Sequence, residues 1–268
     1  MNSRKKFIPE IILDYLNSKG IDFVENLPNE MLSTIEDVIN YCNEKAIESN
    51  KQDFNFEKLV RESLAEGYDS RYLSFFDERS FSRSNFISVV TGIFANLGLA
   101  ENYREQKTIV VGAGNGNNLE SKFVYHGIKD LTLVDIAPKL LEQAKKFMPH
   151  AKIHLGGAEK LEDFPDGTFD LYISLRTYQS TYFNIPSSLL EASRVLKKDG
   201  VILISIACGY TDKNGEYVSG LYNPHTGILE NERANLFITA IKQYLSELAF
   251  NIVGIEKVPT EIFIFARK

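Results

Sequence analysis

Residues 108–118 read TIVVGAGNGNN, a short apolar run followed by three closely spaced glycines. Its first residues are mostly β-branched and predict a buried strand, and Gly112, Gly114 and Gly116 follow directly. Glycines at such a turn let the backbone approach a ligand, and a helix expected over Leu119–His126 presents its first amides to an anionic group. The stretch therefore predicts a ligand-binding turn between a strand and a helix.

Asp135 supports this interpretation. It ends the next apolar run, LTLVDIAP, about 20 residues downstream, where a carboxylate accepts hydrogen bonds from both ribose hydroxyls of a cofactor. The glycine spacing is GxGxG, whereas the dinucleotide fingerprint GxGxxG requires glycine at position 117, which is Asn117. The spacing disfavours a nucleotide-dependent oxidoreductase, which shares the strand, the turn and the acid and stays an alternative.

Outward from the turn, β-rich runs alternate with amphipathic stretches, which is typical of a parallel sheet flanked by helices. The expected strands are Thr108–Val111, Leu131–Val134, Ile153–Leu155, Phe169–Ser174 and Val201–Ile206. Helices are expected over Leu119–His126, Pro138–Phe147, Ser187–Leu196 and Arg233–Leu248. Two last strands, Asn251–Lys257 and Glu261–Ala266, are joined by too short a link for a crossover, so they are expected to pair antiparallel.

The first part of the chain has a different pattern. From Ile8 to about Leu99, apolar residues recur at helical spacing, as in Ile11, Ile12 and Tyr15. We therefore expect residues 1–104 to form a helical cap or lid, and residues 105–268 to form the α/β domain.

Composition limits the classes of function. The net charge of −6 makes a nucleic-acid partner unlikely. Cys42 and Cys208 lie far apart and outside any Cys/His cluster, so we expect two buried thiols and no metal site. The start lacks the pattern of a secretory signal, and no run approaches the roughly 18 apolar residues of a membrane span. We expect a cytoplasmic protein without membrane contact and leave its oligomeric state open.

Four motifs, in order, resemble those of the class I, Rossmann-like S-adenosylmethionine-dependent methyltransferases. They are the GxGxG turn, VDIAPKLLEQAKKF, GGAEKLEDFPDGTFDLYIS and SSLLEASRVLKKDGVILIS, which together cover Thr108 to about Ile206. The resemblance implies S-adenosylmethionine as cofactor and S-adenosylhomocysteine as product. It also implies a mostly parallel seven-stranded sheet with a C-terminal antiparallel hairpin strand, beside the N-terminal helical region.

The resemblance assigns cofactor-binding roles residue by residue. It implies that the three glycines approach the methionine part, Asp135 holds the ribose, Ile136 packs on the adenine, and Ala158 and Glu159 meet the adenine edge. This chain departs from the family at Gly157, where the family often has aspartate. Recognition of the adenine amino group then depends on backbone carbonyls or on Glu159, and an exposed helix-start charge is the alternative role of Glu159.

The acceptor is expected beyond the fourth strand, because loops at the carboxyl ends of parallel strands carry function. The segment LRTYQSTYF, residues 175–183, offers Arg176, Gln179 and Tyr182 to bind an acceptor, and Tyr178 to orient or deprotonate it. Capping of the strand and packing of the loop are the alternative roles of these side chains.

A second acceptor segment is expected in residues 208–231, a long turn-rich connection. It contains Tyr222, a candidate acceptor contact, and His225, a candidate general base that titrates near neutral pH. We expect transfer of a methyl group to an O or N atom of a small molecule by in-line displacement. Methylation of RNA or protein, and a binding protein of the same fold without turnover, stay as alternatives.

Overall fold

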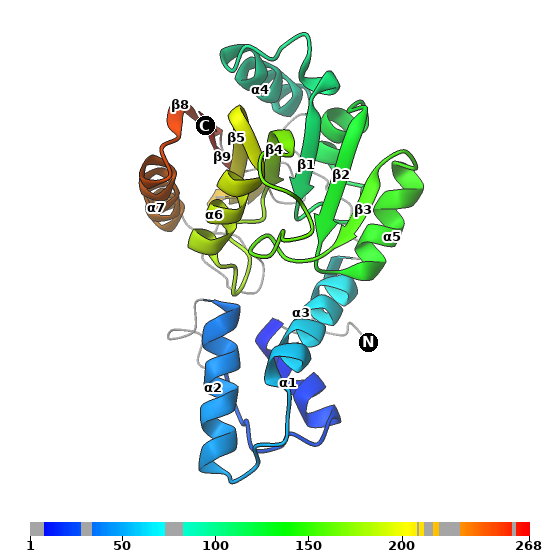
Figure 1. The fold of residues 1–268 in the computed structure, drawn as a ribbon, viewed down its shortest axis with the longest axis vertical. Coiled ribbons are helices and arrows are strands. Elements are labelled where there is room, and N and C mark those ends of the chain that lie inside the picture. The colour runs from blue at the N-terminus through cyan, green and yellow to red at the C-terminus, as the bar shows by residue number, and fades with distance from the viewer. Residues whose placement is uncertain are drawn as a thin grey trace.

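A computed structural model of the chain describes residues 8–27, 34–72, 83–207, 209–211, 217–219, 231–258 and 261–268. Its centre is a seven-stranded sheet in the order β3-β2-β1-β4-β5-β9-β8 (Figure 1). The strands are β1 (Lys107–Val111), β2 (Asp130–Asp135), β3 (Lys152–Leu155), β4 (Phe169–Leu175), β5 (Leu196–Ala207), β8 (Asn251–Val258) and β9 (Glu261–Arg267). The five strands from β3 to β5 pair in parallel, and β9 pairs antiparallel with both β5 and β8. The expected strands and the terminal hairpin are confirmed.

Helices cover both faces of this sheet, because alternate residues of each strand point to opposite sides. Ile109 of β1 belongs to the apolar cluster that includes α6 (Ile185–Val195) and α7 (Asn231–Glu247). Its neighbour Val110 belongs to the cluster on the other face, with α4 (Arg83–Asn96) and α5 (Pro138–Phe147). Strands buried on both faces read as continuous apolar runs, which is why the sequence predicts them well.

The connection between β1 and β2 differs from the expectation. Instead of an α-helix over Leu119–His126, the structure has a five-residue π-helix, Ser121–Tyr125. The amide of Ser121 donates to Asn118 Oδ1 at 2.9 Å, so this amide is used within the loop and is not offered to a ligand. The long connection after β5 contains a short hairpin of β6 (Gly209–Thr211) and β7 (Tyr217–Ser219).

The N-terminal region divides into two parts. Helices α1 (Ile8–Ser18), α2 (Ile35–Glu48) and α3 (Phe56–Tyr72) form an apolar cluster of their own, beside the carboxyl edge of the sheet (Figure 1). Helix α4 also precedes the expected boundary at residue 104, but Phe86 and Ile93 bury it against the sheet. The part that stands apart from the sheet is therefore α1–α3.

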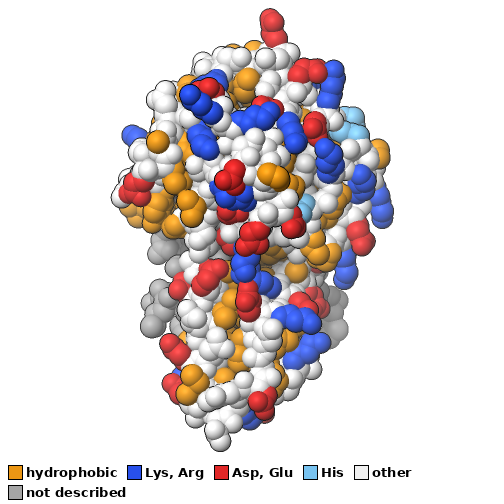
Figure 2. Space-filling model, in the orientation of Figure 1, with side chains coloured by type: hydrophobic (Ala, Val, Ile, Leu, Met, Phe, Trp, Pro, Cys, Tyr) orange, Lys and Arg blue, Asp and Glu red, His pale blue; other side chains and the backbone are white. Residues whose placement is uncertain are grey.

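Surface charges of both signs are interspersed on the face shown in Figure 2. One surface ion pair joins the two parts, that of Lys160 Nζ with Glu57 Oε1 at 3.0 Å. Among the helices in the described segments, none has the length and apolarity needed to cross a membrane.

Gly116 offers a test of how the glycine turn packs. Its φ of +76° is left-handed, and a Cβ there would lie 2.8 Å from Ala144 Cα in α5. We expect Gly116→Ala to lower the free energy of unfolding by about 2–4 kcal/mol, from the strained backbone and the clash together. Urea denaturation measures it.

Gly92 in α4 is the matched control, because it is exposed and a Cβ there would meet nothing within 4 Å. Gly92→Ala is expected to raise stability by up to about 1 kcal/mol, the helix preference of alanine over glycine. Equal unfolding midpoints for the two variants would contradict the packing described for Gly116.

Candidate active site

A cavity of about 550 Å³ lies where the parallel strands end. Each of the five parallel strands contributes its last residue to the wall, namely Val111, Asp135, Leu155, Leu175 and Ala207. Helix α3 closes the opposite side with Arg61, Leu64, Tyr68 and Tyr72. The cavity therefore lies between the sheet and the N-terminal helices.

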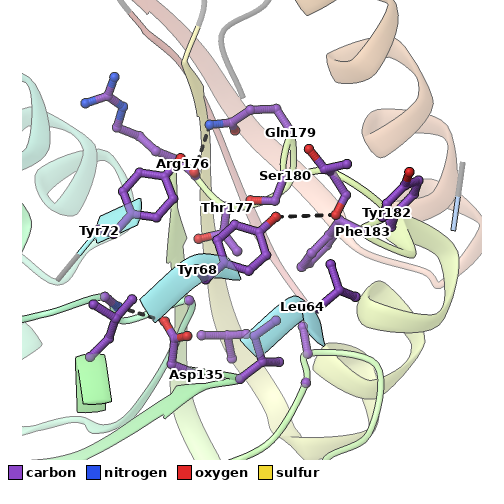
Figure 3. Close-up of a pocket in the computed structure, with 18 of the residues that line it drawn as sticks. Leu64, Tyr68, Tyr72, Asp135, Arg176, Thr177, Gln179, Ser180, Tyr182 and Phe183 are labelled. Atoms are coloured by element: carbon purple, nitrogen blue, oxygen red, sulfur yellow. Dashed lines mark hydrogen bonds between the residues drawn. The ribbon is translucent and has the colours of Figure 1, made fainter. Parts of the chain in front are cut away.

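Asp135 is fixed at the floor of this cavity by backbone amides. Its Oδ2 accepts from Gly114 N at 2.9 Å, as Figure 3 shows, and its Oδ1 accepts from Ala137 N at 3.0 Å. A carboxylate has about four acceptor positions, so this one keeps capacity for two further donors, such as ribose hydroxyls. Burial raises the pKa of Asp135, the two amide donors oppose the rise, and the carboxylate of Asp69 adds to it.

The three glycines of the turn serve different neighbours. Gly112 and Gly114 line the cavity, and a side chain at Gly112 would collide with Thr177 of the acceptor segment. Gly116 does not line the cavity, because it packs against Ala144 of α5. The structure thus places two of the three glycines expected to approach the cofactor at the cavity, and the third beneath it.

The expected adenine-binding residues line the same cavity. Ile136, Ala158 and Glu159 all belong to its wall. Glu159 Oε1 forms an ion pair with Arg61 Nη1 of α3 at 3.1 Å, and its side chain is only 12% exposed. A Cβ at Gly157 would lie 2.6 Å from both carboxylate oxygens of Glu159, so the glycine leaves room for that carboxylate to fold back. Glu159 is therefore a partly buried carboxylate at the cavity wall, where it can accept hydrogen bonds, and not an exposed helix-start charge.

The acceptor segment is held in a strained conformation at the cavity. Arg176 and Tyr182 have left-handed φ values of +60° and +62°, which cost non-glycine residues of the order of 1–3 kcal/mol each. Gln179 Nε2 donates to the carbonyl of Arg176 at 2.7 Å, and Tyr68 Oη donates to the carbonyl of Thr181 at 3.3 Å. Strained residues cluster at functional sites, which supports a binding role for this segment.

Three expected acceptor contacts from this segment line the cavity: Arg176, Gln179 and Tyr182. In Figure 3 the guanidinium of Arg176 points past Tyr72 and away from Asp135. Tyr182 also belongs to the apolar cluster of α1–α3, so it connects the segment to the N-terminal helices.

Tyr178 is a correction. It was expected to orient or deprotonate the acceptor, but it is fully buried in the sheet core and does not line the cavity. Its hydroxyl lies 3.2 Å from the hydroxyl of Tyr172, and burial raises its pKa well above the ordinary value. A hydroxyl so placed neither reaches an acceptor in the cavity nor gives up its proton near neutral pH.

Two candidates lie outside the described residues. They are Tyr222 and His225, so their roles stay predictions. His150 bonds to the carbonyl of Ile128, and the ring of His154 packs on Phe164. In the described segments, no group of three His, Cys, Asp or Glu side chains could hold a metal ion.

Helix α3 contains the cavity residues that sequence reasoning did not assign. They are Arg61, Leu64 and Tyr68, which the sequence analysis assigns no individual role. Their shared signal is spacing along one helix, since residues 61, 64 and 68 lie on one face. That face becomes recognisable only once the sheet edge opposite it is known.

Comparisons with known proteins agree with these features. The family model of a methyltransferase domain matches residues 109–204. A search of curated proteins finds no match. Among solved structures, the chain is similar to an S-adenosylmethionine-dependent methyltransferase from Aquifex aeolicus, at 16% identity and a TM-score of 0.47, covering 66% of this chain and 87% of the other.

Two further solved structures are similar to this chain. One is the 1,6-didemethyltoxoflavin-N1-methyltransferase of Burkholderia thailandensis, with its substrate and S-adenosylhomocysteine bound. Its identity is 18% and its TM-score 0.48, covering 78% of this chain and 87% of the other. The other is the geranyl diphosphate C-methyltransferase of Streptomyces coelicolor A3(2), at 10% identity and a TM-score of 0.47, covering 76% and 83%.

The family match coincides with the part of the chain that builds the sheet side of the cavity. It runs from Ile109 in β1 to Ile204 in β5 and contains the glycine turn, Asp135 and Ala158. The sheet around it has a reversed strand, β9, next to β5, as the four sequence motifs imply. Residues 109–204 of this chain therefore form a methyltransferase domain.

Proposed function

We propose that this enzyme methylates an O or N atom of a small molecule inside the cavity between the sheet and α3. The observation that carries the proposal is the enclosure of one cavity by both parts of the chain. Its volume of about 550 Å³ falls within the roughly 300–1,000 Å³ of small-molecule sites. A macromolecular acceptor needs an open face, and the net charge of −6 disfavours a nucleic acid.

The residues present fit S-adenosylmethionine. Asp135 has acceptor capacity for two ribose hydroxyls, Ile136 and Ala158 give apolar contact for the adenine, and Gly112 and Gly114 leave space beside the strand end. When bound, the cofactor supplies an electrophilic methyl group on a sulfonium. We propose that Asp135 fixes the adenosine end, so that the methyl group faces the acceptor segment.

Methyl transfer requires alignment and exclusion of water more than acid–base chemistry. The residues around the cavity would therefore hold the acceptor in line with the methyl group that the bound cofactor would supply. The strained acceptor segment places Gln179 and Tyr182 at the cavity, and α3 covers the site. A proton that leaves an O or N acceptor passes to water or to a base, for which His225 stays a candidate.

The cofactor assignment is tested by calorimetry. We expect S-adenosylhomocysteine to bind and NAD⁺ not to bind. Asp135→Ala is expected to weaken S-adenosylhomocysteine binding by at least about 100-fold, since it removes two hydrogen bonds to a charged group, which contribute about 1.5–3 kcal/mol each. Tyr178→Phe, a change outside the cavity, is the control and keeps wild-type affinity. Binding of NAD⁺, or equal affinity of Asp135→Ala and wild type, would refute the assignment.

The acceptor class is tested by turnover. Labelled S-adenosylmethionine is incubated with the enzyme and with small molecules that carry hydroxyl or amine groups, and with RNA and protein extracts. Transfer to a small molecule supports the proposal, whereas label that enters only RNA or protein contradicts it.

Binding of S-adenosylhomocysteine should strengthen as pH rises through the raised pKa of Asp135. Below that pKa the carboxyl is protonated and gives up part of its acceptor capacity, whereas above it the carboxylate accepts both ribose hydroxyls. Affinity measured from pH 4 to 8 is expected to rise and then level off. Asp135→Asn, which does not titrate, is expected to lack this rise, and the same rise in that variant would assign it to another group.

We propose that the carboxylate of Glu159 accepts a hydrogen bond from the adenine amino group. Its carboxylate lies in the space that Gly157 leaves open at the cavity wall. The inosine analogue of S-adenosylhomocysteine has an oxygen in place of this amino group, so wild type is expected to bind it at least about tenfold more weakly. Glu159→Gln can donate as well as accept and should narrow the difference. An unchanged preference in Glu159→Gln would assign recognition to backbone carbonyls instead.

A further inference from the structure

Helix α5 lacks a cap of its own. Its first residue is Pro138, and the residue before it, Ala137, has extended φ and ψ of −99° and 104° and no side-chain hydrogen bond to the helix. Leu141 is the first residue whose amide bonds within the helix, to the carbonyl of Ala137 at 3.2 Å. The preceding amides need partners from outside the helix.

Asp69 of α3 supplies one of these partners. Its Oδ1 accepts a hydrogen bond from the amide of Leu140 at 3.0 Å, across 71 residues of sequence. Asp69 is only 4% exposed, and a negative charge at a helix N-terminus is favourable. The N-terminal helices thus cap a helix of the sheet domain.

The capped turn is the one that holds the ribose-binding carboxylate. Ala137, directly before α5, donates its amide to Asp135 Oδ1 at 3.0 Å. The position of the first turn of α5 therefore fixes one of the two donors that orient Asp135. The other donor, Gly114, belongs to the glycine turn.

Helix α3 also holds the glycine turn. The carbonyl of Tyr72, three residues after Asp69, accepts from Asn115 Nδ2 at 3.0 Å. Asn115 is only 5% exposed, and its Oδ1 in turn accepts from the amide of Asn117 at 3.0 Å. The last turn of α3 thus contacts the first turn of α5 and the glycine turn. These two turns lie beside the two amides that donate to Asp135.

We propose that Asp69 is a positioning residue for cofactor binding, which caps α5 from the N-terminal region and thereby holds Asp135 in place for the ribose. The proposal rests on the placement of the ribose at Asp135 made above. In this proposal α3 covers the cavity and also positions a residue of the cofactor site.

The test compares three variants of the full-length protein by calorimetry with S-adenosylhomocysteine. Asp69→Ala removes the cap and is expected to weaken binding about fivefold, the usual size of a lost helix cap. Asp69→Asn keeps a good capping acceptor and is expected to bind within about twofold of wild type. Glu66→Ala removes an exposed carboxylate from the same helix and is expected to bind as wild type does.

Hydrogen exchange of the ligand-free protein gives a second measurement, and its results for wild type and Asp69→Asn do not depend on the folding of Asp69→Ala. The Leu140 amide is expected to exchange slowly in wild type and in Asp69→Asn, and faster in Asp69→Ala. Fast exchange of this amide in wild type overturns the proposal.

The two proposals fail in different ways. Equal affinity of Asp69→Ala and wild type, or failure of Asp69→Asn to restore binding, overturns the positioning role and leaves the cofactor site intact. Failure of wild type to bind S-adenosylhomocysteine overturns both.

Discussion

The hydrogen bonds that Asp135 accepts from Gly114 and Ala137 fix the floor of the cavity, and the proposed cofactor site is built around them. They form because β1 and β2 run in parallel register, with Val111 beside Val134, so that the loops after both strands meet. The amides of Gly112 and Ala113 continue the contact by donating to the carbonyl of Val134. A buried carboxylate is costly unless it is hydrogen-bonded, and these backbone amides offset part of that cost.

Residues 175–183 at the cavity are also held by contacts from both sides, from the glycine turn and from α3. Thr177 packs where Gly112 lacks a side chain, so the acceptor segment and the cofactor turn touch directly. Tyr68 holds the carbonyl of Thr181 from the opposite wall. The unfavourable backbone angles of Arg176 and Tyr182 persist because hydrogen bonds and packing on both sides determine them.

The sheet, and several of the residues that line the cavity where its strands end, could be predicted from the sequence because each signal is local. Apolar runs mark strands buried on both faces, a three-residue link requires a hairpin, and a glycine turn followed by an acid marks a nucleoside site. The π-helix at Ser121–Tyr125 and the short hairpin after β5 were not predictable in this way. In the first of these, Asn118 caps the turn with a side-chain contact that no periodicity indicates.

The parts of the site that sequence reasoning missed depend on contacts between distant segments. In the sequence, Tyr178 lies among polar residues of a predicted functional loop. In the structure its side chain is buried in the core, where its hydroxyl contacts the hydroxyl of Tyr172. Arg61 and Asp69 read as ordinary helix charges, but they meet Glu159 and the amide of Leu140. Such partners are set by the tertiary fold, and one sequence contains no local record of them.

The burial of Tyr182 among the N-terminal helices makes the cavity a shared product of two parts of the chain. In the proposed function, the sheet side binds the cofactor, while α3 and the cluster behind it shape the space for the acceptor. Substitutions along α3 can therefore reshape acceptor choice without altering any strand. In evolution, exchange of the helices that precede the sheet would give such an enzyme new substrates while it kept the same methyl donor.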